Sequence, residues 1–155
     1  MNKEYTSLGL MSGTSGDGVD ASIICSDGET KYKVILDKFF QYEDDIYKSI
    51  HNLKGKIFNL KDLAIYRKEL QDLERNITLF HVKAVKETLD TSKSSVDLIG
   101  FHGQTIFHDP EKKTTKQLGN GKLLSQFTKK KVVYNFRQND LENGGQGAPL
   151  TPIFH

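Results

Sequence analysis

The sequence predicts an α/β domain in which helices cover a mixed β-sheet. Three observations lead to this fold class. Apolar runs separated by turn residues open the chain, a long stretch with helical periodicity follows, and the remainder alternates strand-like runs with short helical ones. The length of 155 residues gives room for one domain with a buried core.

The first three runs are expected to form an antiparallel meander. Residues 6–11 and 18–25 have strand character, and the segment 12–18 between them is rich in glycine, serine and aspartate, which favour a hairpin turn. Residues 26–29 form a second turn, and the partial alternation across 32–42 predicts the third strand.

Helical sequence occupies the middle of the chain. Residues 43–52 form a short candidate helix, which ends at Lys54 and Gly55. Apolar residues then recur three and four positions apart, which predicts one helix from about residue 60 to about residue 89. Its apolar face consists of Leu63, Tyr66, Leu70, Leu73, Ile77, Phe80 and Ala84. This face can either pack on the sheet or join two copies through a coiled-coil seam, so a homodimer stays open.

The last third of the chain is expected to complete the sheet. A loop at 91–95 leads into a buried strand at 96–101. The remaining expected elements are a hairpin of residues 104–108 and 114–118 around a turn at 109–113, a helix at 120–130, and a strand at 132–136 parallel to the strand at 96–101.

Composition and charge exclude several classes of protein. Lys and Arg total 22 against 20 Asp and Glu, and this net charge of +2 argues against a nucleic-acid or membrane-surface binder. The single cysteine, Cys25, allows neither an internal disulfide nor a cysteine-based zinc site, and we expect it to be a small core residue. No apolar run reaches membrane-spanning length, so a reducing, cytoplasmic location is expected.

The segment 13–20, Gly-Thr-Ser-Gly-Asp-Gly-Val-Asp, has the composition of a phosphate-binding turn. Glycines let several backbone N–H groups face one ligand, and Thr14 and Ser15 add hydroxyl groups. Asp17 and Asp20 would repel a bare phosphate, so they make sense if Mg²⁺ bridges them to it. An ordinary glycine-rich hairpin is the alternative interpretation.

Two further clusters carry polar groups that suit a ligand. His102 and Gln104 follow the buried strand at 96–101, where ligands bind in many α/β folds. Arg137 and Asp140 lie three residues apart at the start of a helix and so share a side of it. Arg137 can orient a carboxylate or phosphate, Asp140 can act as a general base, and the glycines of 144–147 let backbone approach a ligand.

Taken together, these motifs resemble the anhydro-N-acetylmuramic acid kinases of bacteria. The motifs that carry the resemblance are Gly-Leu-Met-Ser-Gly-Thr-Ser at 9–15, Asp-Gly-Val-Asp-Ala at 17–21, His-Gly-Gln-Thr at 102–105, Phe136-Arg137 with Asp140, and Gly-Gly-Gln-Gly-Ala-Pro-Leu at 144–150. The resemblance implies a ribonuclease-H-like lobe of the sugar-kinase and actin-like superfamily. Because family members are longer and the chain ends on the apolar segment 148–155, we expect residues 1–155 to be the N-terminal lobe without its C-terminal partner.

The resemblance also implies a reaction and residue roles. Family enzymes use ATP and Mg²⁺ to convert 1,6-anhydro-N-acetylmuramic acid into N-acetylmuramic acid 6-phosphate in cell-wall recycling. Asp140 would be the catalytic base, Asp17 the Mg²⁺ ligand, and His102, Gln104 and Arg137 contacts to the sugar or its lactyl carboxylate. The ATP phosphate loop would be Gly13, Thr14, Ser15, Gly16, Asp17, Gly18, Val19 and Asp20. The chain alone is expected to be inactive, because adenosine would bind mostly on the second lobe.

Two departures and two alternatives accompany this interpretation. Gly16 replaces a bulky apolar residue that is usual in the family, which is expected to loosen the loop, and Asn135 stands where an Asp is frequent. A nuclease of ribonuclease-H-like fold would need clustered carboxylates for two metals, and the near-neutral charge gives little help with a polyanion. The other alternative is a non-catalytic dimerisation or interaction module.

Overall fold

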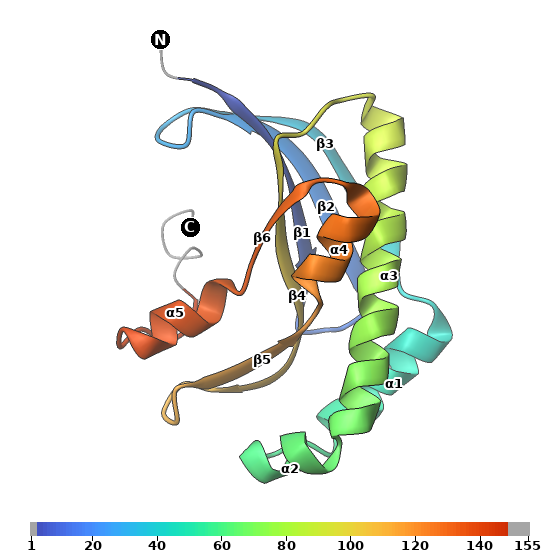
Figure 1. Cartoon of the computed structure of the whole chain (residues 1–155), viewed down its shortest axis with the longest axis vertical. Helices are drawn as coiled ribbons and strands as arrows, with labels where there is room; N and C mark the ends of the chain where they lie inside the picture. Colours follow the sequence, from blue (N-terminus) through green and yellow to red (C-terminus); the bar gives the residue numbers. More distant parts are fainter. Residues whose placement is uncertain (1–2, 149–155) are drawn as a thin grey trace.

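A computed structural model describes residues 3–148, in which the central element is a mixed β-sheet (Figure 1). In chain order the elements are β1 (Tyr5–Ser12), β2 (Gly18–Ser26), β3 (Tyr32–Gln41), α1 (Asp44–Lys54), α2 (Leu60–Ile65), α3 (Arg67–Ser92), β4 (Leu98–Asp109), β5 (Thr114–Leu118), α4 (Gly121–Thr128), β6 (Lys131–Tyr134) and α5 (Phe136–Glu142). Helices α1, α3 and α4 lie on one side of the sheet and α5 lies on the other (Figure 1). This arrangement confirms the predicted α/β class and suits a ribonuclease-H-like lobe.

The sheet joins an antiparallel meander to a parallel pair. Its strand order within residues 3–148 is β3-β2-β1-β4-β5, and β6 also pairs with β4. β1, β2 and β3 are successively antiparallel, and β4 is parallel to β1 and to β6. β5 forms the predicted hairpin with the second half of β4. The expected meander, second hairpin and parallel last strand are therefore confirmed.

The core lies between the sheet and α3. Alternate residues of β1 and β2, such as Leu8 and Ile23, point into it and have no exposed surface. On α3, Ile77 and Val85 are also fully buried. Burying each of these side chains stabilises the fold by roughly 1.5–3 kcal/mol before conformational entropy is counted.

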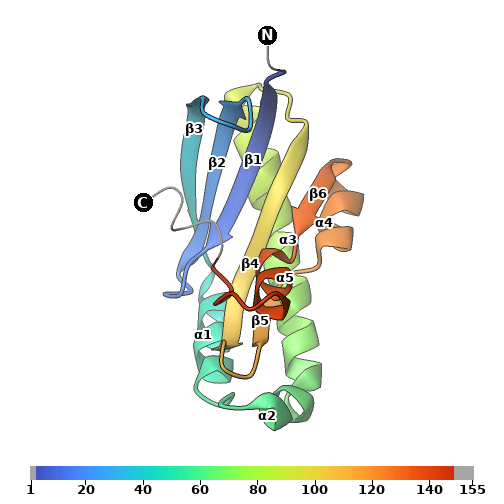
Figure 2. The same cartoon turned by 90° about the vertical axis from the view of Figure 1, so that its left-hand side faces the viewer.

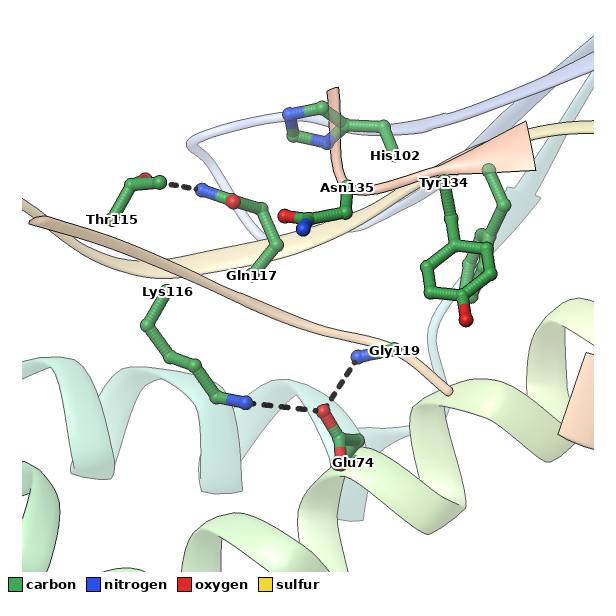
Figure 3. Close-up of a pocket in the computed structure, with 9 residues that line it drawn as sticks. Glu74, His102, Thr115, Lys116, Gln117, Gly119, Tyr134 and Asn135 are labelled. Atoms are coloured by element: carbon green, nitrogen blue, oxygen red, sulfur yellow. Dashed lines mark hydrogen bonds and ion pairs between the residues drawn. The ribbon is translucent and has the colours of Figure 1, made fainter. Parts of the chain in front are cut away.

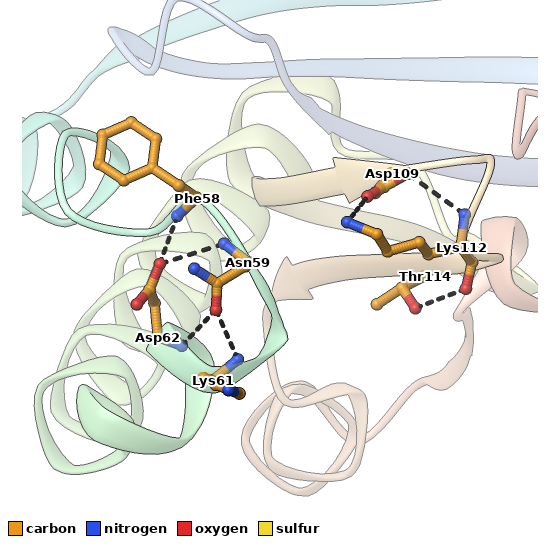
Figure 4. A network of polar contacts seen from close by, with 7 residues as sticks. All are labelled: Phe58, Asn59, Lys61, Asp62, Asp109, Lys112 and Thr114. Atoms are coloured by element: carbon orange, nitrogen blue, oxygen red, sulfur yellow. Dashed lines mark hydrogen bonds and ion pairs between the residues drawn. The ribbon is translucent and has the colours of Figure 1, made fainter.

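The long helix predicted from residue 60 to 89 is in fact two helices that meet at Tyr66. The Asn59 side chain accepts hydrogen bonds from the backbone of Lys61 and Asp62, and the Asp62 carboxylate accepts from the backbone of Phe58 and Asn59 (Figure 4). This capping box gives α2 its own start. Tyr66 then has φ −94° and ψ 22°, which ends α2 before α3 begins.

The apolar face of α3 is part of the core, so the coiled-coil alternative for it is wrong. Leu70, Leu73, Ile77 and Ala84 are each at most 5% exposed. A helix face that covers the sheet of its own chain cannot also pack along a second helix. The periodic spacing of apolar residues therefore reflects burial within this domain.

Two smaller expectations concern Cys25 and the membrane. Cys25 is half-buried in β2, and its thiol lies 3.5 Å from a carboxylate oxygen of Glu4, so it is not the core residue that the apolar run predicted. Ile23, two residues earlier, is fully buried, but the pairing of β2 with β3 shifts register between Ile23 and Ile24, so the buried alternation does not continue to Cys25. Within residues 3–148 no helix is long and apolar enough to cross a membrane.

His81 is a polar group buried inside this core. It has no exposed surface, and its ring lies edge-on to Phe101 with centroids 4.9 Å apart. Its Nδ1 lies 2.7 Å from the Ile77 carbonyl oxygen and so carries the donated proton, whereas Nε2 has no partner in the described part of the chain. Burial is the main cause that lowers the pKa of His81 to about 4, and the nearby His102 lowers it further.

The buried His81 predicts a loss of stability in mild acid. The folded pKa lies below the unfolded value near 6.5, so the unfolded chain binds more protons between these values. The free energy of unfolding should therefore be highest above about pH 6.5 and fall by about 1.4 kcal/mol per pH unit toward pH 4, on the order of 3 kcal/mol in all. Urea denaturation across this range measures the slope.

A His81→Leu variant should flatten most of this slope, and His102, whose pKa is also lowered by burial, should account for what remains. The matched control is His51→Gln, because His51 is exposed on α1. An unchanged slope in His81→Leu would contradict the prediction.

Candidate functional site

The predicted phosphate-binding segment forms a tight β-turn between β1 and β2. The Gly16 N–H donates to the Gly13 carbonyl over 3.1 Å, which makes Thr14 and Ser15 the two central residues of the turn. Both have a negative φ, which is what a type I turn requires of its central residues. Gly16 has φ +64° and is buried, and an added Cβ would lie 3.0 Å from Ile50 of α1. The expectation that Gly16 loosens the loop is therefore wrong, because it closes the turn against α1.

Gln104 lies beneath this turn and does not face a ligand. A β-bulge between Phe101 and Gln104, with Gly103 at φ +76°, shifts the alternation of β4. His102 consequently stays on the open face of the sheet, while Gln104 turns inward and has no exposed surface. The expected contact between Gln104 and a sugar is therefore a wrong prediction, because the bulge buries its side chain.

Gln104 instead ties the turn to β4. Its Nε2 donates to the Gly13 carbonyl over 2.9 Å, and its Oε1 lies 2.5 Å from Ser12 Oγ. Ser12 Oγ is also 2.9 Å from the Tyr42 hydroxyl, whose pKa burial raises to about 12. These buried polar groups satisfy one another, so they fix the turn where β1 ends beside β4.

The outer side of the turn carries groups that can bind an anion. Thr14, Ser15 and Asp17 are exposed, and the N–H groups of Thr14 and Ser15 bond to nothing within residues 3–148. Ser15 Oγ donates to an Asp17 carboxylate oxygen over 2.6 Å. This hydrogen bond is the main cause that lowers the pKa of Asp17, so its carboxylate is ionised at neutral pH.

Asp17 is a suitable ligand for Mg²⁺, which commonly uses one or two carboxylates together with phosphates and water. The described part of the chain contains no group of three or more His, Cys, Asp or Glu side chains that could hold a metal alone. Asp20 belongs to β2 and lines the cavity described below. Val19, predicted as part of the phosphate loop, is wholly buried and belongs to the core.

A cavity of about 390 Å³ lies on the open face of the sheet. In Figure 2, α5 lies in front of the sheet on this face. Gly9 and Gly100, paired in register across β1 and β4, are among the residues that line it. A Cβ added at either would meet nothing closer than 3.8 Å, so glycine there leaves space open. Asp20, His102 and Arg137 also line it.

Arg137 is locked in place by His102 and by the glycine loop. Its Nε donates to His102 Nε2 over 2.7 Å, and its Nη1 donates to the Gly147 carbonyl over 2.8 Å. Because His102 Nε2 accepts, the ring proton is on Nδ1, which lies 2.7 Å from the Gly103 carbonyl. Burial, and then the Arg137 charge, lower the pKa of His102, so the ring is neutral. Nη2 of Arg137 has no partner in residues 3–148, and it can bind a carboxylate in the cavity.

Asp140 holds the glycine loop that follows α5. Its Oδ2 accepts from the Gly147 N–H over 2.7 Å, and its carboxylate lies so close to Gly145 that a Cβ there would clash. Oδ1 has no hydrogen-bond partner in the described chain. Asp140 is not among the residues that line the cavity beside Arg137. Pro149 and Leu150 of the predicted motif, and most of the apolar segment 148–155, lie outside the described residues.

Asn135 begins α5 from the left-handed region, with φ +63°, which Asn adopts more readily than most residues. It lines a second cavity of about 220 Å³ together with His102, Gln117 and Tyr134 (Figure 3). Below it, Glu74 of α3 accepts from Lys116 and from the Gly119 N–H. His102 therefore borders both cavities.

Sequence reasoning missed two features of this site. Lys54, at the end of α1, donates to the Thr14 carbonyl, although no motif singles it out. The paired glycines at 9 and 100 line the cavity together, and only the strand register shows that they are neighbours. Gly9 belongs to the first motif, so this motif could have indicated that Gly9 lies in a ligand site.

Comparison with known proteins identifies similar chains. A model of the family described as anhydro-N-acetylmuramic acid kinase matches residues 5–155. The anhydro-N-acetylmuramic acid kinase of Pelagibacter ubique (strain HTCC1062) is 59% identical over 155 residues, which is 100% of this chain and 41% of that protein. The proteins of the same name from Agrobacterium fabrum and Zymomonas mobilis are 38% and 39% identical, over 100% and 96% of this chain and 42% of each relative. The chain thus spans about two fifths of the length of these relatives.

The hydrogen bonds of Gln104 predict that Gln104→Ala destabilises the protein and frees the turn. The substitution removes one hydrogen bond from buried Ser12, which keeps its bond to Tyr42, and one from the Gly13 carbonyl, which keeps its bond from Gly16. Losing the two bonds costs about 1–3 kcal/mol. Urea denaturation measures this loss, and hydrogen exchange should show faster exchange for Gly16. Gln71→Ala on the exposed side of α3 is the control. Equal stability of the two variants would contradict this role of Gln104.

Proposed function

The chain belongs to the anhydro-N-acetylmuramic acid kinase family, and on that premise we propose that it supplies the phosphate loop and the sugar cavity of such a kinase. The reaction is the ATP-dependent conversion of 1,6-anhydro-N-acetylmuramic acid into N-acetylmuramic acid 6-phosphate. The single observation that carries the proposal is the cavity over Gly9 and Gly100, bordered by a locked arginine and lying on the strand that leads into the anion-binding turn.

The proposed chemistry divides between the turn and the cavity. A water attacks C1 of the sugar, the bond from C1 to O6 breaks, and O6 takes the γ-phosphoryl group while a base takes the proton of the water. The N–H groups of Thr14 and Ser15 hold phosphate oxygens at the turn. Mg²⁺ bound by Asp17 would neutralise phosphate charge. These groups position and neutralise charge, which is what phosphoryl transfer requires.

In the cavity, the opposite charges of Arg137 and Asp20 would set the orientation of the sugar. The outer edge of Arg137 is the natural partner of the lactyl carboxylate, because the neutral His102 leaves its positive charge uncompensated. Asp20, which has no polar partner within residues 3–148, can accept hydrogen bonds from sugar hydroxyls or from the acetamido N–H. The open floor at Gly9 leaves room for the sugar ring.

We propose further that residues 1–155 correspond to the N-terminal lobe of a two-lobe kinase and that turnover requires both lobes. The greater length of the relatives supports this arrangement. Closure of two lobes keeps bulk water away from the γ-phosphoryl group during its transfer. ATP- and sugar-dependent transfer by the 155-residue chain alone would overturn the requirement for a second lobe.

The function is tested with a kinase that contains these residues together with the rest of the relatives' length. It should phosphorylate anhydro-N-acetylmuramic acid with ATP and Mg²⁺ and should leave plain N-acetylmuramic acid largely unused. Gly9→Val should abolish sugar-dependent turnover and keep the fold, since a strand accepts valine and the new side chain enters the cavity. Val133→Thr on exposed β6 is the control. Normal turnover by Gly9→Val would contradict the sugar site.

That Asp140 is the general base stays a prediction, and two substitutions separate it from the loop-holding role. Asn at 140 can still accept from the Gly147 N–H but cannot take a proton, whereas Ala does neither. If Asp140 is the base, Asp140→Asn lowers kcat by roughly 10²- to 10⁴-fold with little change in sugar binding. Near-normal kcat in Asp140→Asn, with a loss only in Asp140→Ala, would assign Asp140 to the loop alone.

A further inference from the structure

The C-terminal end of α1 lies against the anion-binding turn. Ile50 packs on Gly16, and the Lys54 ammonium donates to the carbonyl of Thr14. Lys54 is half-buried and has no carboxylate partner in residues 3–148, which distinguishes it from Lys48, exposed and paired with Asp44 on the same helix. Burial lowers the pKa of Lys54. Lys54 thus loses part of its hydration for a hydrogen bond to a backbone carbonyl alone, which points to a role for this contact at the turn.

The carbonyl that Lys54 holds belongs to the central peptide of the turn. In a trans peptide the C=O and the following N–H point in opposite directions. Holding the Thr14 C=O toward α1 therefore directs the Ser15 N–H away from α1. By the same geometry, Gln104 holds the Gly13 C=O from beneath and directs the Thr14 N–H outward. Two side chains thus orient two consecutive peptides of the turn.

The central peptide of a β-turn is the one that can flip. Type I and type II turns differ by rotation of this peptide, and type II needs a positive φ at the third residue, here Ser15. In the flipped form the Thr14 carbonyl oxygen would point outward, where a phosphate would meet a second negative oxygen. Ser15 disfavours the flip because it is not glycine, and the bond from Lys54 disfavours it further.

We propose that Lys54 is a positioning residue for the phosphate-binding turn, which holds the Thr14–Ser15 peptide so that the Ser15 N–H faces the phosphate. The proposal rests on the phosphate-binding role given to this turn. Lys54 acts through the peptide and not by pairing with the phosphate, since its ammonium lies on the carbonyl side of that peptide. A simple helix-end role, in which Lys54 only stabilises the last turn of α1, is the rival explanation.

The test reads the turn directly in the 155-residue chain by NMR. In a type I turn the amide protons of Thr14 and Ser15 are close, whereas in type II the Thr14 Hα approaches the Ser15 amide. Wild type should show the first pattern. Lys54→Met, which keeps the aliphatic stem, should show a mixture, and adding Ser15→Gly should shift it toward type II. Lys48→Met, which makes the same change in net charge, is the matched control and should keep the wild-type pattern.

Titration with inorganic tripolyphosphate then links the turn to binding. The amide signals of Thr14 and Ser15 should move in wild type and in Lys48→Met, and Lys54→Met should bind about tenfold more weakly, as expected for one misdirected charge-assisted hydrogen bond. A wild-type turn pattern in Lys54→Met would overturn the proposal, whether binding is unchanged or weakened, because weakening would then come from charge alone.

Different results would contradict the phosphate-binding role of the turn and the positioning role of Lys54. If tripolyphosphate moves no turn signals in wild type while Lys54→Met still flips the peptide, the phosphate role of the turn fails and the orienting contact stands. If wild type binds and Lys54→Met neither flips nor weakens binding, the phosphate role stands and the role of Lys54 fails. Signals elsewhere in the spectrum report whether each variant is folded.

Discussion

The hydrogen bonds of Gln104 to Ser12 and Gly13 are the constraint on which the site depends. They connect the end of β1 to β4 where the parallel pairing of these two strands shifts register. A fully buried amide must bond both its oxygen and its nitrogen, so the bulge at Gly103 and the turn after Ser12 can form only together. The turn is therefore fixed by the core beneath it as well as by Gly16, which closes it against α1.

The turn and the cavity are built in the same way: protein groups hold one side of a polar group and leave its other side free. At the turn, protein groups hold the carbonyl oxygens of Gly13 and Thr14, which leaves N–H groups facing outward. In the cavity, His102 and the Gly147 carbonyl hold one edge of Arg137, which leaves its other edge free for a ligand. Donors that are held in this way need little reorganisation when an anion arrives, and this is the basis of electrostatic preorganisation. The proposed kinase of an acidic sugar would need such donors for both the phosphates and the carboxylate.

Local patterns predicted much of the fold and part of the site. Alternation and turn composition were enough for the meander and the second hairpin, and spacing was enough for the buried face of α3. The errors come from single residues that override the pattern. The backbone conformation of Tyr66 divides one periodic stretch into two helices, and the bulge at Gly103 turns Gln104 inward. Val19 points into the core because it alternates with exposed Asp20 along β2. Cys25 is only half-buried because the buried alternation stops at the register shift after Ile23.

The sequence by itself determined the α/β class, the three glycine-rich motifs and the family, because these depend on residue types and their spacing along the chain. Only the tertiary structure decided which motif residues face a ligand. Gly9 meets Gly100, Arg137 meets His102 and Lys54 meets Thr14 across 91, 35 and 40 positions of sequence, and such pairs are set by strand register and helix packing. These long-range contacts decide which groups hold the site in place and which groups are free to bind a ligand.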